Sequence, residues 1–169
     1  PKTPELQFGI PLGISYKGWD LSMLFQGAAL TSLQLSGPAV WDFPVMGAQG
    51  NNMGKVKSMH LDSWTPDNPD ASYPALHLGN HPNNKNASSS LFLYNASYLR
   101  LKNIEIGYSL PQKWIQRAHL QQVRFYVQGM NLLTFDKLGD VNMDPETGNG
   151  DGSWYPIQRI YNFGVNVTF

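Results

Sequence analysis

The densest run of oxygen-bearing side chains is DVNMDPETGNGD, residues 140–151. Asp140, Asn142 and Asp144 stand at positions one, three and five, where a calcium-binding EF-hand loop places its first ligands. The run then departs from that motif, because Pro145 occupies the position that needs glycine and Asp151 stands where a bidentate glutamate belongs. Two interpretations stay open, an irregular calcium site and a loop without metal, and we expect no cofactor.

Other potential ligands and catalytic groups lie in one long irregular stretch between residues 29 and 92. Its histidines are His60, His77 and His81, and its paired carboxylates would be Asp62, Asp67 and Asp70. The sequence HLGNHP is not helical, so two histidines would not share a face there, and no helix or strand fixes the spacing of the acids. Cysteine is absent, which excludes thiolate catalysis and zinc–thiolate sites. We therefore expect no enzyme, and a hydrolase is the least favoured class.

Aromatic residues in the irregular segments offer a different chemistry. They could stack on sugar rings or pack against a partner protein, and they could equally hold the loops together. The candidates are Trp41, Trp64, Tyr73 and Trp154.

Strict alternation of apolar and polar residues predicts the elements that position these side chains. Five strands are predicted, at about residues 5–16, 19–28, 93–110, 123–135 and 157–169. Within them, Pro11 predicts one bulge and a change of parity at Lys102–Asn103 predicts another. The connections are a turn at 17–18, a short helix within 111–122, and long loops at about 29–92 and 136–156. If neighbours are antiparallel, the two short connections share one end of the sheet and the two long loops share the other.

Composition narrows the class of protein. Basic and acidic residues balance at 12 each and only 14% of residues are charged, so no basic surface for nucleic acid is expected. No apolar run approaches the roughly 18 residues of a transmembrane helix, which excludes a helical membrane protein. Two all-β classes remain, a secreted carbohydrate-binding β-sandwich and a lipid-facing β-barrel. The long strands, the neutral polar faces and the arrangement of short turns opposite long loops favour the barrel.

Five separated stretches resemble the C-terminal end of the SusC/RagA type of TonB-dependent outer-membrane transporter of Bacteroidetes. They are YKGWDLSMLFQGA at 16–28, YLRLKNIEIGYSLP at 98–111, VQGMNLLTF at 127–135, DPETG at 144–148 and RIYNFGVNVTF at 159–169. The resemblance implies the last five antiparallel strands of a 22-stranded transmembrane β-barrel in the bacterial outer membrane. It also implies that loops 29–92 and 136–156 are extracellular, whereas turn 17–18 and the short helix are periplasmic.

The same resemblance implies a function and a set of partners. Such transporters import oligosaccharides or peptides with a SusD-like surface lipoprotein as a lid, and are energised through TonB. The expected partners are the remaining strands and plug of the same transporter, that lipoprotein, the TonB complex, the barrel-assembly machinery and outer-membrane lipid. Substrate identity would be set mostly by parts outside this chain.

The resemblance also gives a meaning to the last predicted strand. Barrel proteins of the outer membrane end on an alternating strand that closes with an aromatic residue and is read by the barrel-assembly machinery. The matching residues are Tyr161, Phe163, Val165, Val167 and Phe169. Phe169 could instead be only the last lipid-facing residue of an aromatic girdle.

Overall fold

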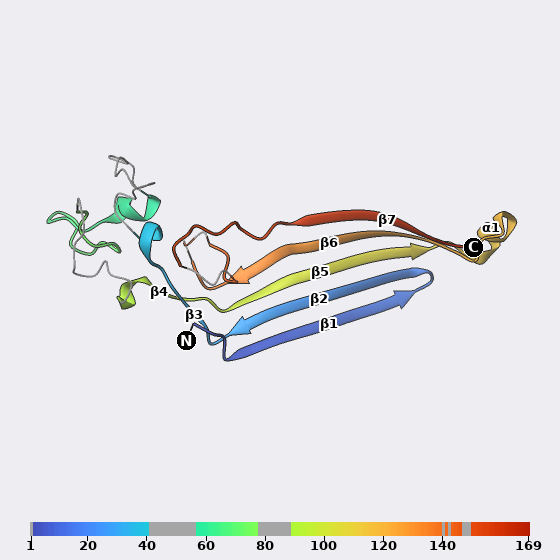
Figure 1. The fold of residues 1–169 in the computed structure, drawn as a ribbon, viewed down its shortest axis with the longest axis horizontal. Helices are drawn as coiled ribbons and strands as arrows, with labels where there is room; N and C mark the ends of the chain where they lie inside the picture. The colour runs from blue at the N-terminus through green and yellow to red at the C-terminus, as the bar shows by residue number, and fades with distance from the viewer. Residues whose placement is uncertain (1, 41–56, 78–88, 140, 142, 147–149) are drawn as a thin grey trace.

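The computed structural model describes residues 2–40, 57–77, 89–139, 141, 143–146 and 150–169. Its main feature is one antiparallel sheet of five strands arranged in chain order, β1-β2-β5-β6-β7 (Figure 1). The strands are β1 Leu6–Tyr16, β2 Trp19–Ala29, β5 Tyr98–Ser109, β6 Gln122–Asp136 and β7 Ile160–Thr168. The predicted all-β class with five antiparallel strands is confirmed.

Register places the apolar residues of all five strands on one face. Residues paired across an antiparallel ladder share a face, and one such row reads Ile14, Leu21, Ile106, Val127 and Phe163. The next row toward the 17–18 turn reads Tyr16, Trp19, Tyr108, Phe125 and Val165. Most of these side chains are exposed, because nothing in the described chain packs on that face. The sheet therefore presents a continuous apolar surface.

One predicted bulge is present and the other is absent. In the β2–β5 ladder Phe25 pairs with Leu101 and Leu24 with Asn103, so Lys102 is the extra residue expected there. Pro11, in contrast, pairs in regular register with Leu24 and causes no bulge. A proline whose nitrogen faces away from the paired strand removes no hydrogen bond from that ladder, which agrees with the regular β1–β2 register.

Two predicted strands differ in extent. The strand predicted over 93–110 is interrupted, because Ala96 donates its N–H to the carbonyl of Thr31 (3.0 Å) and leaves the main sheet. Its first part, β4 Leu93–Asn95, pairs instead with β3 Ser32–Gln34, a short strand inside the segment expected to be a loop. The last strand begins at Ile160 rather than 157, since Asn131 opposite has a φ of 54° and donates its Nδ2–H to the carbonyl of Gln158 (3.2 Å).

The described core lies beyond the sheet, at the end that carries β3 and β4 (Figure 1). This end also holds three short 3-10 helices, η1 Gly37–Ala39, η2 Ser58–Asp62 and η3 Ser90–Phe92. The buried apolar residues at this end of the sheet form one cluster: Leu33, Leu35, Val40, Tyr73, Phe92, Ala96 and Leu138. We call this part the loop-end core. Parts of the described segments between β2 and β5 therefore pack into a core, whereas most of residues 61–70 are exposed.

The opposite end of the sheet carries the short connections (Figure 1). Lys17 and Gly18 form the β1–β2 turn with φ values of 48° and 86°, and the amide of Ser109 donates to the Gly18 carbonyl (2.8 Å). The helix predicted within 111–122 is α1 Gln112–Ile115, continued by η4 Gln116–Ala118. No helix in the described ranges is long and apolar enough to cross a membrane.

Candidate functional site

The second face of the sheet is polar and mostly uncharged. One row across the five strands reads Gly13, Ser22, Glu105, Gln128 and Asn162. This face is the candidate functional surface, because it presents hydrogen-bonding groups on a regular scaffold and carries the charged side chains of the strands in two clusters.

The first cluster ties three strands together on this face. Arg124 of β6 donates from Nε to Oδ1 of Asp20 on β2 (3.0 Å), and from Nη2 to Oδ2 of Asp20. The same Nη2 donates to Oε1 of Glu105 on β5 (2.7 Å). Gly107 makes room for it, because a Cβ there would lie 2.3 Å from Arg124 Nη2. The cluster therefore pairs one positive group with two negative ones, and the missing side chain at Gly107 lets the guanidinium lie against the backbone of the sheet.

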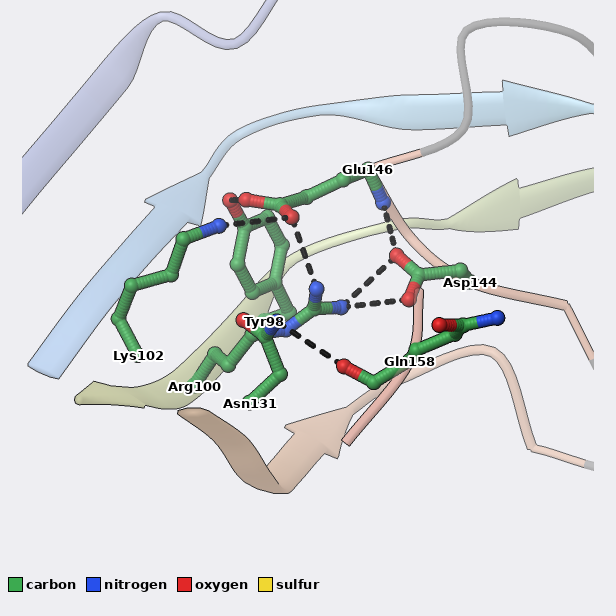
Figure 2. A network of polar contacts seen from close by, with 7 residues as sticks. All are labelled: Tyr98, Arg100, Lys102, Asn131, Asp144, Glu146 and Gln158. Carbon is green, nitrogen blue, oxygen red and sulfur yellow. Dashed lines mark hydrogen bonds and ion pairs between the residues drawn. The ribbon is translucent and has the colours of Figure 1, made fainter. Parts of the chain in front are cut away.

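The second cluster joins the sheet to the segment that follows β6 (Figure 2). Arg100 of β5 is 1% exposed and donates from Nη2 to both carboxylate oxygens of Asp144, each at 2.8 Å. Its Nη1 donates to Oε2 of Glu146 (2.8 Å), and the hydroxyl of Tyr98 donates to Oε1 of the same carboxylate (2.6 Å). Lys102 lies 3.6 Å from Glu146 Oε2. We call these five residues the Arg100 clamp.

Local geometry presents both acids to the one arginine. The backbone N–H of Glu146 donates to Oδ1 of Asp144 (2.9 Å), a turn that Pro145 pre-sets by its fixed φ. The two carboxylates are 12% and 20% exposed, so water replaces little of the interaction with Arg100. The Arg100 clamp therefore fixes the 144–146 turn against the end of β5.

The clamp bears directly on the proposed calcium site. Asp140 and Asn142 lie outside the described residues, and Asp144 turns both of its oxygens toward Arg100. No cluster of three acidic or histidine side chains able to hold a metal occurs among the described residues. The chemistry that the structure shows at Asp144 is an ion pair.

A cavity of about 390 Å³ opens beside the clamp. Trp154 is 60% exposed and is part of its wall, so this predicted contact residue lies next to the polar cluster. The cavity is otherwise lined mainly by polar side chains: Arg100, Asn131, Thr134, Asp136, Asp144 and Arg159.

Two of the other predicted aromatic contacts, Tyr73 and Trp64, lie in or beside the loop-end core. Tyr73 is 3% exposed, donates its hydroxyl to the carbonyl of Val40 and stacks on His60 with ring centroids 4.7 Å apart. Burial raises the pKa of Tyr73 to about 12, and burial together with the charge of Lys57 lowers the pKa of His60. Trp64 is 45% exposed and donates its backbone N–H to the carbonyl of Tyr73 (2.8 Å). The fourth candidate, Trp41, lies outside the described residues.

The residues predicted as an assembly signal are on the apolar face of β7 or directly after it. All five side chains are exposed: Tyr161, Phe163, Val165, Val167 and Phe169. The strand pairs with β6 on one side only. Gly164 on the opposite face accommodates the ring of Tyr126, which a Cβ would approach to 2.3 Å.

Both ion-pair clusters were missed by the sequence analysis, although a signal was present. A charged residue on the polar parity of an otherwise neutral strand needs a partner, and Asp20, Glu105 and Arg124 are such residues. Their pairing depends on strand register, however, and the pairing of Arg100 depends on a turn 44 residues further along the chain.

Comparison with known proteins agrees with this architecture. No family model matches the chain. TonB-dependent receptors P3 and P26 of Formosa agariphila are each 28% identical to it, over 178 and 180 residues that cover 99% and 98% of this chain. The chain spans only 16% and 17% of their lengths.

A solved structure of the RagAB peptide transporter superposes with a TM-score of 0.77 at 28% identity. The match covers 99% of this chain and 17% of that one. The sheet thus matches the C-terminal part of a RagA-like barrel. Sequence, sheet and relatives agree, and the chain is similar to the C-terminal part of TonB-dependent receptors of the SusC/RagA type.

Proposed function

We propose that this chain forms part of the wall of an outer-membrane importer, with lipid on its apolar face and an aqueous lumen on its polar face. The observation that carries the proposal is the unbroken apolar surface over all five strands, opposite a neutral polar surface. In a water-soluble sandwich a second sheet would cover the apolar face. The second sheet in the described chain has only two strands of three residues each.

The spacing of aromatic side chains fits a membrane. Tyr16, Trp19 and Tyr108 form a row at the turn end, and Phe8 and Phe135 lie in a row at the loop end. Eight residues separate Phe8 from Tyr16 along β1, which is about 26 Å of strand at ~3.3 Å per residue. A strand tilted by roughly 40° would then space the two rows by about 20 Å, close to the ~25 Å apolar band of such barrels.

The Arg100 clamp has a mechanical role in this proposal. It holds the segment after β6 over the loop end of the polar face, where Trp154 and the cavity lie. A buried arginine bonded to two carboxylates has a defined geometry, so the segment is positioned before any ligand arrives. The clamp would thus help to shape the outer part of the lumen.

The match to RagAB, described as a peptide transporter, supports peptides as the cargo. Oligosaccharides are the alternative class of cargo. A SusD-like lipoprotein would close over the end that carries the loop-end core, and TonB would supply energy through the plug. The remaining strands would pair with the free edges of β1 and β7, and the terminal alternation would guide assembly.

Cysteine labelling of adjacent residues on β6 of the full-length transporter tests which face meets lipid. Val127 is on the apolar face and Gln128 on the polar face. In a background without other cysteines, Gln128→Cys should react with a charged maleimide, whereas Val127→Cys should react only with a membrane-soluble one. Equal labelling of both by the charged reagent would overturn the proposed orientation. Uptake of a labelled peptide mixture, abolished by a protonophore, tests the transport activity separately.

A further inference from the structure

The turn end of the sheet carries a basic surface. Lys17 in the β1–β2 turn, and Lys113 and Arg117 in the α1–η4 segment, are all exposed. No Asp or Glu occurs in the sequence between Glu5 and Asp20, or between Glu105 and Asp136. We call Lys17, Lys113 and Arg117 the basic rim.

The described contacts hold both basic connections at the same end of the sheet. The Ser109 amide bonds to the Gly18 carbonyl at 2.8 Å, which joins the turn to the chain just before α1. The Gln121 amide bonds to the Thr168 carbonyl at 2.8 Å, which holds the far end of the segment to β7 (Figure 1). Ile115 is buried and anchors the helix, so the polar residues around it face outward.

The acid nearest in sequence does not neutralise the rim. Asp20 is already bonded to Arg124 on the polar face, and Glu105 shares the same guanidinium. The Nζ of Lys17 lies 5.0 Å from the ring centroid of Tyr16, so this ammonium is close to the aromatic row of the apolar face.

An interfacial aromatic row lies directly beside the rim. Trp19 and Tyr108 pack with ring centroids 4.7 Å apart, and Trp114 of α1 is 63% exposed. Amphipathic aromatic rings prefer the boundary between hydrocarbon and head groups. Positive charges just beyond that boundary would lie at the level of lipid phosphates.

We propose that the basic rim binds the head groups of anionic phospholipids in the leaflet at the turn end. The proposal rests on the proposed function, because it requires the apolar face to lie in a bilayer. Complementary charge selects this occupant: three cations on connections that contain no Asp or Glu attract an anionic leaflet, and Trp114 and the aromatic row bring them to its surface.

The test is a titration of the full-length transporter in detergent with phosphatidylglycerol or phosphatidylcholine, followed by native mass spectrometry. The test variant is Lys113→Gln with Arg117→Gln. The matched control is Lys2→Gln with Lys137→Gln, which removes two exposed charges at the loop end. Each basic residue near an anionic surface contributes roughly a fivefold change in affinity, so the apparent Kd for phosphatidylglycerol should rise about 25-fold in the test variant.

The control variant should bind phosphatidylglycerol as the wild type does, and phosphatidylcholine binding should not change in either variant. An unchanged Kd for phosphatidylglycerol in the test variant, or an equal rise in the control, would overturn the proposal. An unchanged Kd in the test variant would indicate that the basic rim binds an acidic protein surface instead. Heat-dependent gel mobility checks that each variant forms the barrel. If the double variant does not assemble, Lys17→Gln replaces it as the test variant.

Failure of the proposed function would look different. In that case the wild-type protein would not enter bilayers and β6 labelling would not distinguish the two faces. A transporter that labels as proposed and imports peptide, yet shows no preference for phosphatidylglycerol, would contradict the basic rim alone.

Discussion

Replacing Arg100 by methionine should release the segment after β6 from the sheet. Methionine keeps much of the apolar stem but removes the guanidinium that is bonded to Asp144 and Glu146. The two carboxylates would then remain 12% and 20% exposed without their main partner. Breaking a buried pair in this way costs about 3–5 kcal/mol, because an uncompensated charge stays desolvated.

The lost free energy should appear as local opening of the segment after β6, because the clamp joins that segment to one end of β5. A change of about 4 kcal/mol corresponds to roughly a thousandfold increase in the open population. Hydrogen exchange of the full-length transporter would measure it at the amides of Glu146 and Ser36. The first bonds to Asp144, and the second donates to the carbonyl of Gly150 (3.0 Å).

Two further variants distinguish the loss of the Arg100 clamp from a general destabilisation of the protein. Arg124→Met removes the same group from the other cluster, which pairs with Asp20 and Glu105 and not with the segment after β6 in the described contacts, and should leave exchange there unchanged. Arg100→Met combined with Asp144→Asn and Glu146→Gln removes all three charges and should recover most of the protection, as neutral replacement of a buried pair often does. The reasoning would be refuted by unchanged exchange in Arg100→Met, or by no recovery in the triple variant.

Two further predictions concern the loop end. Gly150→Ala should weaken protection of the Ser36 amide by about 1–3 kcal/mol, because a Cβ there would lie 1.8 Å from the carbonyl oxygen of Gln34 and backbone must move. Gly13→Ala, whose Cβ would have no heavy atom nearer than 3.9 Å, is the matched control and should change nothing in the same exchange measurement. The pKa of His60 is lowered from its ordinary value of 6.5 in the folded segment. Below pH 6.5 the unfolded segment therefore takes up a proton that the folded segment does not. The stability of the loop-end core should fall as the pH falls through this range. Exchange of the Tyr73 amide at several pH values, corrected for intrinsic rates, measures this, and His60→Gln should flatten the dependence.

The sequence predicted the strands well because alternation is a local signal. A period of two along β1 or β7 needs no knowledge of any other segment, and the bulge at Lys102 follows from a change of parity within one strand. The loop-end core was not predicted, since β3 and β4 have three residues each and show too little alternation to recognise. Its packing depends on residues as far apart in the chain as Leu33 and Leu138.

The Arg100 clamp shows where local patterns stop being sufficient. YLRLKN and DPETG were both visible as motifs of the resemblance, yet nothing in either stretch states that one binds the other. The contact requires β6 to run the full length of the sheet and the chain to turn back over β5. The calcium-like spacing was a local signal at Asp144, whereas the ion pair that the structure shows there depends on tertiary contact with Arg100.

Charge in the strands gives a criterion that sequence analysis could have used. The five long strands contain six charged residues: Asp20, Arg100, Lys102, Glu105, Arg124 and Asp136. Five of them form ion pairs, and the sixth accepts the N–H of Leu138 at 3.0 Å. Three are positive and three negative, so the strands themselves add no net charge to the polar face. A wall built in this way would attract neither anionic nor cationic ligands strongly. Discrimination along it would then depend on shape and hydrogen bonding, which suits a conduit for varied oligomers better than a site for one charged ligand.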